Sequence, residues 1–346
     1  MIRYSERYWN DVGEVAGEIP GIEKIYNRSV FITGATGMIC SAVAEILLWL
    51  NKTANAGIRI YLAGRDKTRV KNRFYCFDEG RDYYFTFFDA AEGGILDLQA
   101  DYMIHGAGNA DPGSMSRQPV ETMLANIVGL DRLLSAAVRG STKRLLYISS
   151  SEVYGKKANA EPYRENDYGY VDILNPRACY PCSKRAAETL CAAYAKEFGL
   201  DTVTVRPGHI YGPSITDTDD RASAQFTRAA AAGQDIVMKS AGQQLRSYCY
   251  TLDCASGILA VLLNGEVGTA YNISNRDSVV TIRDVAEAFA EAAGVKVVYS
   301  DPSDAEKRSY NLMDNSALDA RRLELLGWRG RFDLKRGVGK TMEMLK

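Results

Sequence analysis

The sequence predicts an α/β protein with a Rossmann-type, doubly wound parallel sheet and a smaller C-terminal substrate-binding domain. Apolar, strand-like runs alternate with helical segments as far as residue 205, which is typical of a parallel sheet covered by helices on both faces. A turn with two glycines follows the first of these runs. After Arg206 the alternation gives way to loops rich in Gly, Asp and Ser and to shorter mixed elements.

The elements are expected in a simple order along the chain. Residues 1–27 are polar with interspersed aromatic residues, so we expect an N-terminal extension, a helix or cap outside the main fold. The dinucleotide-binding domain is expected over 28–205 with a return segment at about 248–273, and the substrate domain over 206–247 and 274–346. The expected strands are Ser29–Thr33, Ile58–Ala63, Tyr83–Phe88, Tyr102–His105, Arg144–Ser149 and Thr202–Val205. The expected helices include Gly37–Leu50, Val120–Arg139, Cys182–Phe198 and Ile282–Ala293.

Composition excludes several classes of function. The net charge of −1 argues against a nucleic-acid partner, because such proteins usually carry a basic excess. The sequence shows neither a secretory signal nor an apolar run near the roughly 20 residues of a membrane span, so we expect no membrane partner. Only two histidines argue against a zinc site. Cys179 and Cys182 have C-x-x-C spacing but surround Tyr180, with no second pair, and a reducing cytoplasm is the expected setting.

The turn TGATGMIC, residues 33–40, lies where a dinucleotide fingerprint belongs, between the first strand and the first helix. Gly34 and Gly37 allow a tight turn and a close approach of the backbone to a pyrophosphate, and the helix N-terminus offers free N–H groups. The third glycine of the pattern is replaced by Cys40, which is small enough for close packing. The expected contacts here are Gly34, Thr36, Gly37, Met38 and Ile39. The alternative is an ordinary strand–turn–helix with two glycines.

The ends of the second and third strands carry candidate adenosine contacts. Arg65 is suited to stacking on adenine or to pairing with a 2′-phosphate, which favours NADP, and Asp66 to binding the ribose, which favours NAD. Asp89, followed by Ala90, is placed to accept the adenine amino group. The alternatives are a solvated surface arginine and a turn aspartate.

Tyr180 and Lys184 form a Y-x-x-x-K pattern, which puts both side chains on one face of a helix. An ammonium beside a phenol favours the phenolate and is expected to lower the pKa of Tyr180 from about 10 toward neutrality. Such a tyrosine can take the proton of a sugar hydroxyl while hydride leaves the same carbon. The spacing alone is common on helices; its weight comes from the strand that ends in Ser149–Ser151, where the Ser150 hydroxyl can share the proton.

Several segments together resemble the extended short-chain dehydrogenases/reductases of the NAD-dependent epimerase/dehydratase family, from about Val30 onward. They are TGATGMI, IHGAG at 104–108, the region of Asn126, ISSSEVYG at 148–155, NPRACYPCSK at 175–184 and RPGHIYGP at 206–213. The SSSEVYG and NPRACY segments look most like UDP-glucuronate decarboxylases. The resemblance implies Tyr180 as base, Ser150 as its hydroxyl partner, Lys184 as phenolate and ribose contact, and Glu152 near sugar C5. It also implies NAD contacts at Gly106, Ala107, Gly108, Asn126, Ser149, Tyr180, Lys184, Pro207 and His209.

The resemblance implies oxidation at sugar C4, after which three outcomes compete: decarboxylation, 4,6-dehydration and 4-epimerisation. Dehydratases carry an Asp-Glu pair after the catalytic Ser or Thr, whereas this chain has Ser151-Glu152, as decarboxylases do. We therefore rank decarboxylation slightly above epimerisation, and dehydration last. The alternative for Glu152 is a loop carboxylate that caps the following turn.

The substrate side carries conflicting features. Arg246, Arg308 and the loosely matching Arg221 and Gln225 fall where relatives bind the diphosphate or the sugar, and arginine suits phosphate or carboxylate. Any one of the arginines is equally compatible with a surface charge. His209 replaces the usual Asn, which indicates a diverged branch or a packed loop histidine. The remaining substrate candidates are Asn109 and Arg177.

The resemblance also implies a homodimer formed by the helices Val120–Arg139 and Cys182–Phe198. The expected cofactor is NAD, with NADP as the alternative because of Arg65, and the expected partner is a nucleotide-diphosphate sugar. Two other functions remain open, a catalytically idle NAD(P)-binding sensor and a plain NADPH-dependent ketone reductase. The intact Ser150, Tyr180 and Lys184 argue against the sensor.

Overall fold

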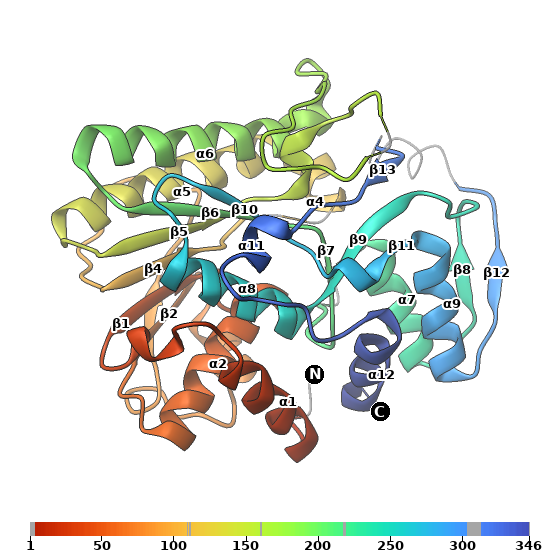
Figure 1. Ribbon diagram of the computed structural model, residues 1–346, viewed down its shortest axis with the longest axis horizontal. Coiled ribbons are helices and arrows are strands. Elements are labelled where there is room, and N and C mark those ends of the chain that lie inside the picture. Colours follow the sequence, from red (N-terminus) through yellow and green to blue (C-terminus); the bar gives the residue numbers. More distant parts are fainter. Residues whose placement is uncertain are drawn as a thin grey trace.

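Seven parallel strands form the main sheet of the computed structural model, which describes residues 4–108, 110, 112–159, 161–216, 219–302 and 313–345 (Figure 1). The strand order is β10-β6-β5-β4-β1-β2-β3, and each neighbouring pair is parallel. The bounds are β1 Ser29–Thr33, β2 Arg59–Gly64, β3 Tyr84–Phe87, β4 Tyr102–His105, β5 Arg144–Ile148, β6 Thr202–Pro207 and β10 Ala270–Ile273. The α/β fold class predicted from the sequence is confirmed.

Helices cover both faces of this sheet. On one face lie α2 (Met38–Ala54) and α8 (Thr251–Asn264), and on the other lie α5 (Pro119–Arg139) and α6 (Cys179–Phe198) (Figure 1). Each face of the sheet has its own apolar cluster. In β1, Val30 and Ile32 pack into the cluster that includes α2 and α8, and Phe31 packs into the cluster that includes α5 and α6. Because every residue of β1 is buried, the strand reads as a continuous apolar run in the sequence.

The N-terminal segment is part of the main core rather than a cap outside it. Helix α1 (Glu6–Gly17) begins after Ser5, whose side chain accepts a hydrogen bond from the backbone of Tyr8. Tyr8, Val12 and Val15, spaced by four and three residues, are buried in the same cluster as α2 and α8. The apolar stripe of α1 therefore extends the layer of helices under the sheet.

A smaller lobe is built from the second half of the chain and lies to the right in Figure 1. Strand β9 is its centre, pairing with β7, β11 and β13, while β8 pairs with β12. The strands are β7 His209–Tyr211, β8 Ile236–Met238, β9 Leu245–Tyr250, β11 Val279–Thr281, β12 Val297–Tyr299 and β13 Asn315–Ser316. The main helices of the lobe are α7 Ala222–Ala231, α9 Ile282–Ala293 and α12 Leu334–Leu345, and the short helices elsewhere are α3 Lys67–Arg73, α4 Pro112–Arg117 and α11 Arg321–Glu324.

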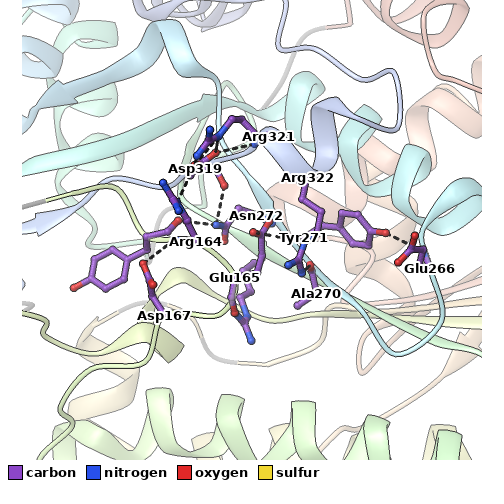
Figure 2. Close-up of polar contacts among 12 residues, drawn as sticks. Arg164, Glu165, Asp167, Glu266, Ala270, Tyr271, Asn272, Asp319, Arg321 and Arg322 are labelled. Carbon is purple, nitrogen blue, oxygen red and sulfur yellow. Dashed lines mark hydrogen bonds and ion pairs between the residues drawn. The ribbon is translucent and has the colours of Figure 1, made fainter.

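The outer edge of the main sheet is closed by two segments from beyond it (Figure 2). The backbone N–H of Asn272 on β10 donates to Glu165 at 3.0 Å, and Arg322 donates to the Ala270 carbonyl at 2.9 Å. The Asn272 side chain donates to the carbonyls of Tyr163 at 2.9 Å and Asp319 at 3.0 Å. These bonds satisfy the exposed edge groups of β10 and hold both segments beside the end of the sheet. In the part of the chain that is described, no helix is long and apolar enough to cross a membrane.

Candidate active site

The order of strands in the main sheet reverses at β1. From β3 the chain returns to the other side of β1 and forms β4, and ligands of open α/β sheets bind at such a reversal, beyond the carboxyl ends of the strands. Gly34–Gly37 follow β1, Gly106–Gly108 follow β4, and Ser149–Ser151 follow β5. Three motifs that are far apart in the sequence therefore meet at one edge.

The glycine turns after β1 and β4 fit against each other without room for side chains. Gly34 has φ +67°, and a Cβ there would lie 2.7 Å from the Gly106 carbonyl oxygen. A Cβ on Gly106 would collide with Cys40 Sγ. Thr33 Oγ1 accepts hydrogen bonds from the backbone N–H groups of Gly106 and Ala107, both at 3.2 Å. This packing leaves the N-terminus of α2, which begins after Gly37, open to an anion.

The candidate adenosine contacts lie on local turns at the ends of β2 and β3. Asp66 caps α3 by accepting the Arg69 N–H at 3.0 Å, and Asp89 accepts the Ala91 N–H at 2.9 Å. The Arg65 side chain is 62% exposed, and among the described residues its one ion pair is with a carboxylate oxygen of Glu121 at 3.5 Å. Asp66 and Asp89 each keep one carboxylate oxygen that these bonds do not use. The backbone of Ala90, next to Asp89, packs closely against Gly129 of α5. Their role toward a cofactor stays a prediction.

Tyr180 and Lys184 are both buried on the first turns of α6, facing the end of β5. Lys184 Nζ donates to the Ile148 carbonyl at 2.8 Å and lies 5.7 Å from the centre of the Tyr180 ring and 4.7 Å from that of Tyr147. The Tyr180 hydroxyl is hydrogen-bonded to the side chain of Ser150. The three residues of the expected constellation are therefore brought together.

The electrostatics of this group differ from the sequence expectation. Burial, followed by the negative charge of Glu152, raises the pKa of Tyr180 to about 12, although the hydrogen bond from Ser150 opposes the rise. Burial lowers the pKa of Lys184 to about 7. The expectation that Lys184 brings the phenol toward neutrality is wrong for this arrangement, because the desolvation of Tyr180 outweighs the interactions that lower its pKa.

Hydrogen bonds hold Tyr147, whose ring lies beside Lys184, in place. Tyr147 donates its hydroxyl to Asn126 Oδ1 at 3.1 Å, and Asn126 in turn donates to the Thr122 carbonyl at 2.8 Å. Asn126 thus ties α5 to β5, and a Cβ on Gly108 would lie 3.5 Å from its amide. Ser149, two residues after Tyr147, has a buried hydroxyl with no hydrogen-bond partner among the described residues. A buried hydroxyl without a partner is expected to bond a ligand.

Glu152 and Arg177 form a bidentate ion pair that the sequence did not predict. The two guanidinium–carboxylate contacts measure 2.9 and 3.0 Å, and both side chains are largely buried. Ser150 caps the turn that carries Glu152 by accepting its N–H at 3.2 Å. Both members of the pair line a cavity of about 300 Å³. Its other walls are Gly155, Lys156, Tyr170, Val171, Asp172, Asn175, Ala178, Pro181 and Met313.

Arg246 on β9 is a buried cation without a carboxylate. Its side chain is bonded to the carbonyls of Leu245, Met313 and Asp314 at 2.9, 2.6 and 3.3 Å, and it forms no ion pair within the described ranges. The residue is 3% exposed, and burial lowers its pKa. Since a buried charge is costly unless it is paired, Arg246 is suited to an anionic ligand.

His209 lies next to Arg246, on β7 directly after Pro207 and Gly208. Its ring packs on Tyr248 with centroids 5.5 Å apart, and Nδ1 is buried with no partner among the residues described. Burial, with Arg246 and Arg221 nearby, lowers the pKa of His209 to about 3. The imidazole is therefore neutral at ordinary pH and offers one donor and one acceptor, as the amide of an asparagine also does.

The remaining substrate candidates are placed less decisively. Arg221 precedes α7 and pairs with Asp219 at 2.5 Å, and its charge lowers the pKa of both Tyr180 and His209. Gln225 is exposed and donates to the Asp220 carbonyl at 2.5 Å. Asn109 and Arg308 lie outside the described residues.

Sequence reasoning missed the buried Arg206. Its guanidinium pairs with Glu188 of α6 at 2.5 Å and donates to the Tyr154 hydroxyl at 3.1 Å and the Glu165 carbonyl at 2.7 Å. It therefore joins α6, which carries Tyr180, to the turn that carries Glu152. The available signal was an arginine at the end of an otherwise buried strand, TVTVRP, because such a charge requires partners.

Comparisons with known proteins agree with this arrangement. A model of the NAD dependent epimerase/dehydratase family matches residues 30–274. The chain is 27% identical to UDP-glucuronic acid decarboxylase 1 of Xenopus tropicalis, over 92% of this chain and 72% of the relative. It is 28% identical to UDP-glucuronic acid decarboxylase 6 of Arabidopsis thaliana, over 90% of this chain and 87% of the relative.

Solved structures share the fold at lower sequence identity. One is the UDP-glucuronic acid 4-epimerase from Bacillus cereus in complex with UDP-glucuronic acid and NAD, with TM-score 0.76, 21% identity, and coverage of 92% of this chain and 98% of that one. Another is a dTDP-glucose 4,6-dehydratase from Bacillus anthracis in complex with NAD, with TM-score 0.75, 20% identity, and coverage of 92% and 96%.

Proposed function

Because the chain belongs to the NAD dependent epimerase/dehydratase family, we propose that it is an NAD-dependent enzyme that oxidises C4 of a nucleotide-diphosphate sugar and then decarboxylates a C6 uronate, with UDP-glucuronate as the substrate to test. The observation that carries the proposal is the Glu152–Arg177 pair in the cavity beside Tyr180. An arginine fork there suits a sugar carboxylate. The names of the relatives, UDP-glucuronic acid decarboxylases, support the same substrate.

The residues present fit NAD as the cofactor. The cradle formed by Gly34, Gly37 and Gly106 leaves no room for side chains where a pyrophosphate approaches, and the unpartnered Ser149 hydroxyl lies nearby. Bound NAD would accept hydride from C4 and could later return it. In this proposal Lys184 contacts the ribose, and Asp66 or Asp89 contacts the adenosine. Exposed Arg65 supports NADP as the alternative.

Tyr180 and Ser150 handle the proton of the C4 hydroxyl in this proposal. Tyr180 takes it while Ser150 shares the hydrogen bond, and this bond with Ser150 lowers the pKa of Tyr180 against the rise that burial causes. This oxidation gives a β-keto acid, because C5 lies between the C4 ketone and the C6 carboxylate. When the C5–C6 bond breaks, CO₂ leaves and the electron pair passes to the C4 oxygen, where Tyr180 and Ser150 can stabilise it before C5 is protonated.

In this proposal Arg177 binds the C6 carboxylate and Glu152 lies beside it. A uronate carboxylate can exchange with Glu152 on Arg177, which leaves two carboxylates close together and favours loss of one as CO₂. A sugar with an uncharged C6 hydroxyl offers no such exchange. The neighbouring Ser151 is 4% exposed and has no acidic proton to give, so dehydration lacks its general acid. In this proposal Arg246 and His209 bind the diphosphate.

The test is incubation of pure protein with UDP-glucuronate and NAD, followed by chromatography of the nucleotides and measurement of CO₂. The proposal expects CO₂ together with UDP-xylose or the 4-ketopentose. Formation of UDP-galacturonate without CO₂ would instead establish 4-epimerisation, the runner-up. Glu152→Gln and Arg177→Gln should each lower CO₂ release by about 100-fold, whereas Arg164→Gln, a matched exposed arginine, should leave it unchanged.

We also propose a homodimer formed through α5 and α6, which pack side by side along one face of the molecule (Figure 1). Val120, Met123 and Leu124 of α5 and Phe198 of α6 are exposed apolar side chains on these helices. A second copy of the pair would cover such residues. Light scattering should give twice the mass of the chain, and Leu124→Glu should shift it toward the monomer.

A further inference from the structure

Tyr180 lies between two cysteines in the first turn of α6, which reads Cys179-Tyr180-Pro181-Cys182. Cys179 is 6% exposed and its sulfur lies 3.9 Å from the Met115 carbonyl, whereas Cys182 is only partly buried. All seven cysteines are free thiols, and of these only Cys182 and the exposed Cys76 are not fully buried. An oxidant from solution therefore meets Cys182 within reach of a second thiol.

The Cα spacing of the two cysteines is compatible with a disulfide. Residues three apart in an α-helix have Cα atoms about 5 Å apart, within the range of about 4.4–6.8 Å found for disulfides. Cys182 is more exposed to solvent than the buried Cys179, so Cys182 is the thiol that reacts first and Cys179 the one that resolves the product.

We propose that Cys179 and Cys182 are a reversible redox pair, which a peroxide converts into a disulfide that displaces Tyr180 and stops turnover. The Cys182 sulfur attacks a peroxide oxygen, the O–O bond breaks, one water leaves and a sulfenic acid forms. The Cys179 sulfur then attacks the sulfenic sulfur, the S–S bond forms, the S–O bond breaks and a second water leaves. Two thiols are oxidised and one hydrogen peroxide is reduced to two waters, and a dithiol reverses the change.

The disulfide cannot form without moving the first turn of α6. The sulfur atoms must approach to about 2.05 Å, which requires Cys179 to leave the Met115 carbonyl and the side chains to turn toward each other. The first-turn amides have no partners within the helix and Pro181 has no N–H, so moving this turn breaks few hydrogen bonds of the helix, although it disturbs the packing of Cys179 and Tyr180 on Met115. Tyr180 moves with it and loses the hydrogen bond to Ser150. A displacement of about 1 Å at a reacting group can lower the rate about 100-fold.

Peptide chemistry gives a direct test, because trypsin releases Ala178–Lys184 as one peptide that contains both cysteines and no other. The full chain is treated with hydrogen peroxide, alkylated and digested without reductant. The proposal expects this peptide to be two hydrogens lighter and unalkylated, and to become doubly alkylated after dithiothreitol. A peptide that remains alkylated, or that carries sulfinic or sulfonic acid on Cys182, would overturn the pair.

The same samples test the effect on function. Turnover should fall about 100-fold on oxidation and return with dithiothreitol. Cys182→Ser should keep basal turnover and lose the reversible inactivation, whereas the matched surface variant Cys76→Ser should keep it. Equal inactivation of Cys182→Ser, or a disulfide with undiminished turnover, contradicts the switch. The peptide masses are read without any substrate, so a wrong assignment of the reaction leaves the disulfide test intact.

Discussion

Cys40 stands where a glycine is usual, and its sulfur contacts Gly106. The structure therefore predicts that a side chain at Gly106 is tolerated only when the Cys40 sulfur is removed. A Cβ on Gly106 would collide with Cys40 Sγ and lie 3.1 Å from Ile148 Cδ1. Cys40 is 3% exposed on α2 and cannot swing away. Gly106→Ala should therefore destabilise the protein by about 3 kcal/mol, the upper part of the range for overpacking.

Removing the sulfur should restore most of this loss. Cys40→Ala alone costs about 1 kcal/mol through lost packing, but in the Gly106→Ala background it makes room for the new methyl group. The double variant should be about 2 kcal/mol more stable than Gly106→Ala, a coupling typical of residues in contact. Urea unfolding gives the free energies, and titration with NAD should show the same order of affinities, because the two glycine turns and α2 form the cradle together.

Gly34→Ala provides the matched control. It should be as damaging as Gly106→Ala, because its Cβ meets the Gly106 carbonyl oxygen at 2.7 Å and its φ is +67°. Cys40→Ala has no bearing on that clash and should not rescue it. If the double variant of Cys40 and Gly106 is no more stable than Gly106→Ala, or if Gly34→Ala is rescued equally, the assignment of the contact to Sγ is wrong.

Three further predictions concern the catalytic and phosphate groups. Tyr180→Phe should lower turnover by about 10²–10⁴-fold while UDP still binds, as calorimetry can show, because only the proton transfer is lost. Arg246→Gln should weaken UDP binding by about 10–100-fold in the same assay, because a charge-assisted bond contributes about 1.5–3 kcal/mol. Because the pKa of Lys184 is about 7 in the folded chain and 10.5 for a lysine free in water, the unfolded chain binds the extra proton between these values. The free energy of unfolding should therefore rise with pH from 7 toward 10.5, a slope that Lys184→Met should reduce in urea titrations at several pH values.

The central strands of the main sheet were predictable because both faces are buried, as in β1 and β6, whereas the edge strand β10 was not predicted as a strand. Ser29–Thr33 and Tyr102–His105 coincide with β1 and β4, and the helix at Ile282–Ala293 coincides with α9. Helix α8 was not predicted from the sequence, because 13 of its 14 residues are buried and no polar face marks its period. Helix α1 was placed outside the fold although Tyr8, Val12 and Val15 carry a helical apolar spacing.

The candidate site was predictable as a set of residues but not as a set of contacts. Ser150, Tyr180 and Lys184 were expected together and are together, because the strand and helix that carry them are fixed by the fold. Glu152 and Arg177 were both expected near the sugar, yet their 25-residue separation runs through a loop, and no spacing rule predicts that a loop folds back to form a bidentate pair. The high pKa of Tyr180 was missed because a sequence pattern shows which charges are near and not how much water is excluded.

Two buried arginines illustrate how charge distinguishes support from function in this site. Arg206 and Arg246 are 2% and 3% exposed, so each was removed from water at a cost of several kcal/mol that requires compensation. Arg206 is compensated within the chain by the carboxylate of Glu188, and its role is to hold α6 against the Glu152 turn. Arg246 is bonded to carbonyl oxygens, and in the described part of the chain it forms no direct ion pair. Asp314 and Glu152 raise its pKa, but burial outweighs them and lowers it. Because burial still outweighs these charges, an anion from outside the protein would add to the compensation of Arg246, which favours a phosphorylated substrate at this position.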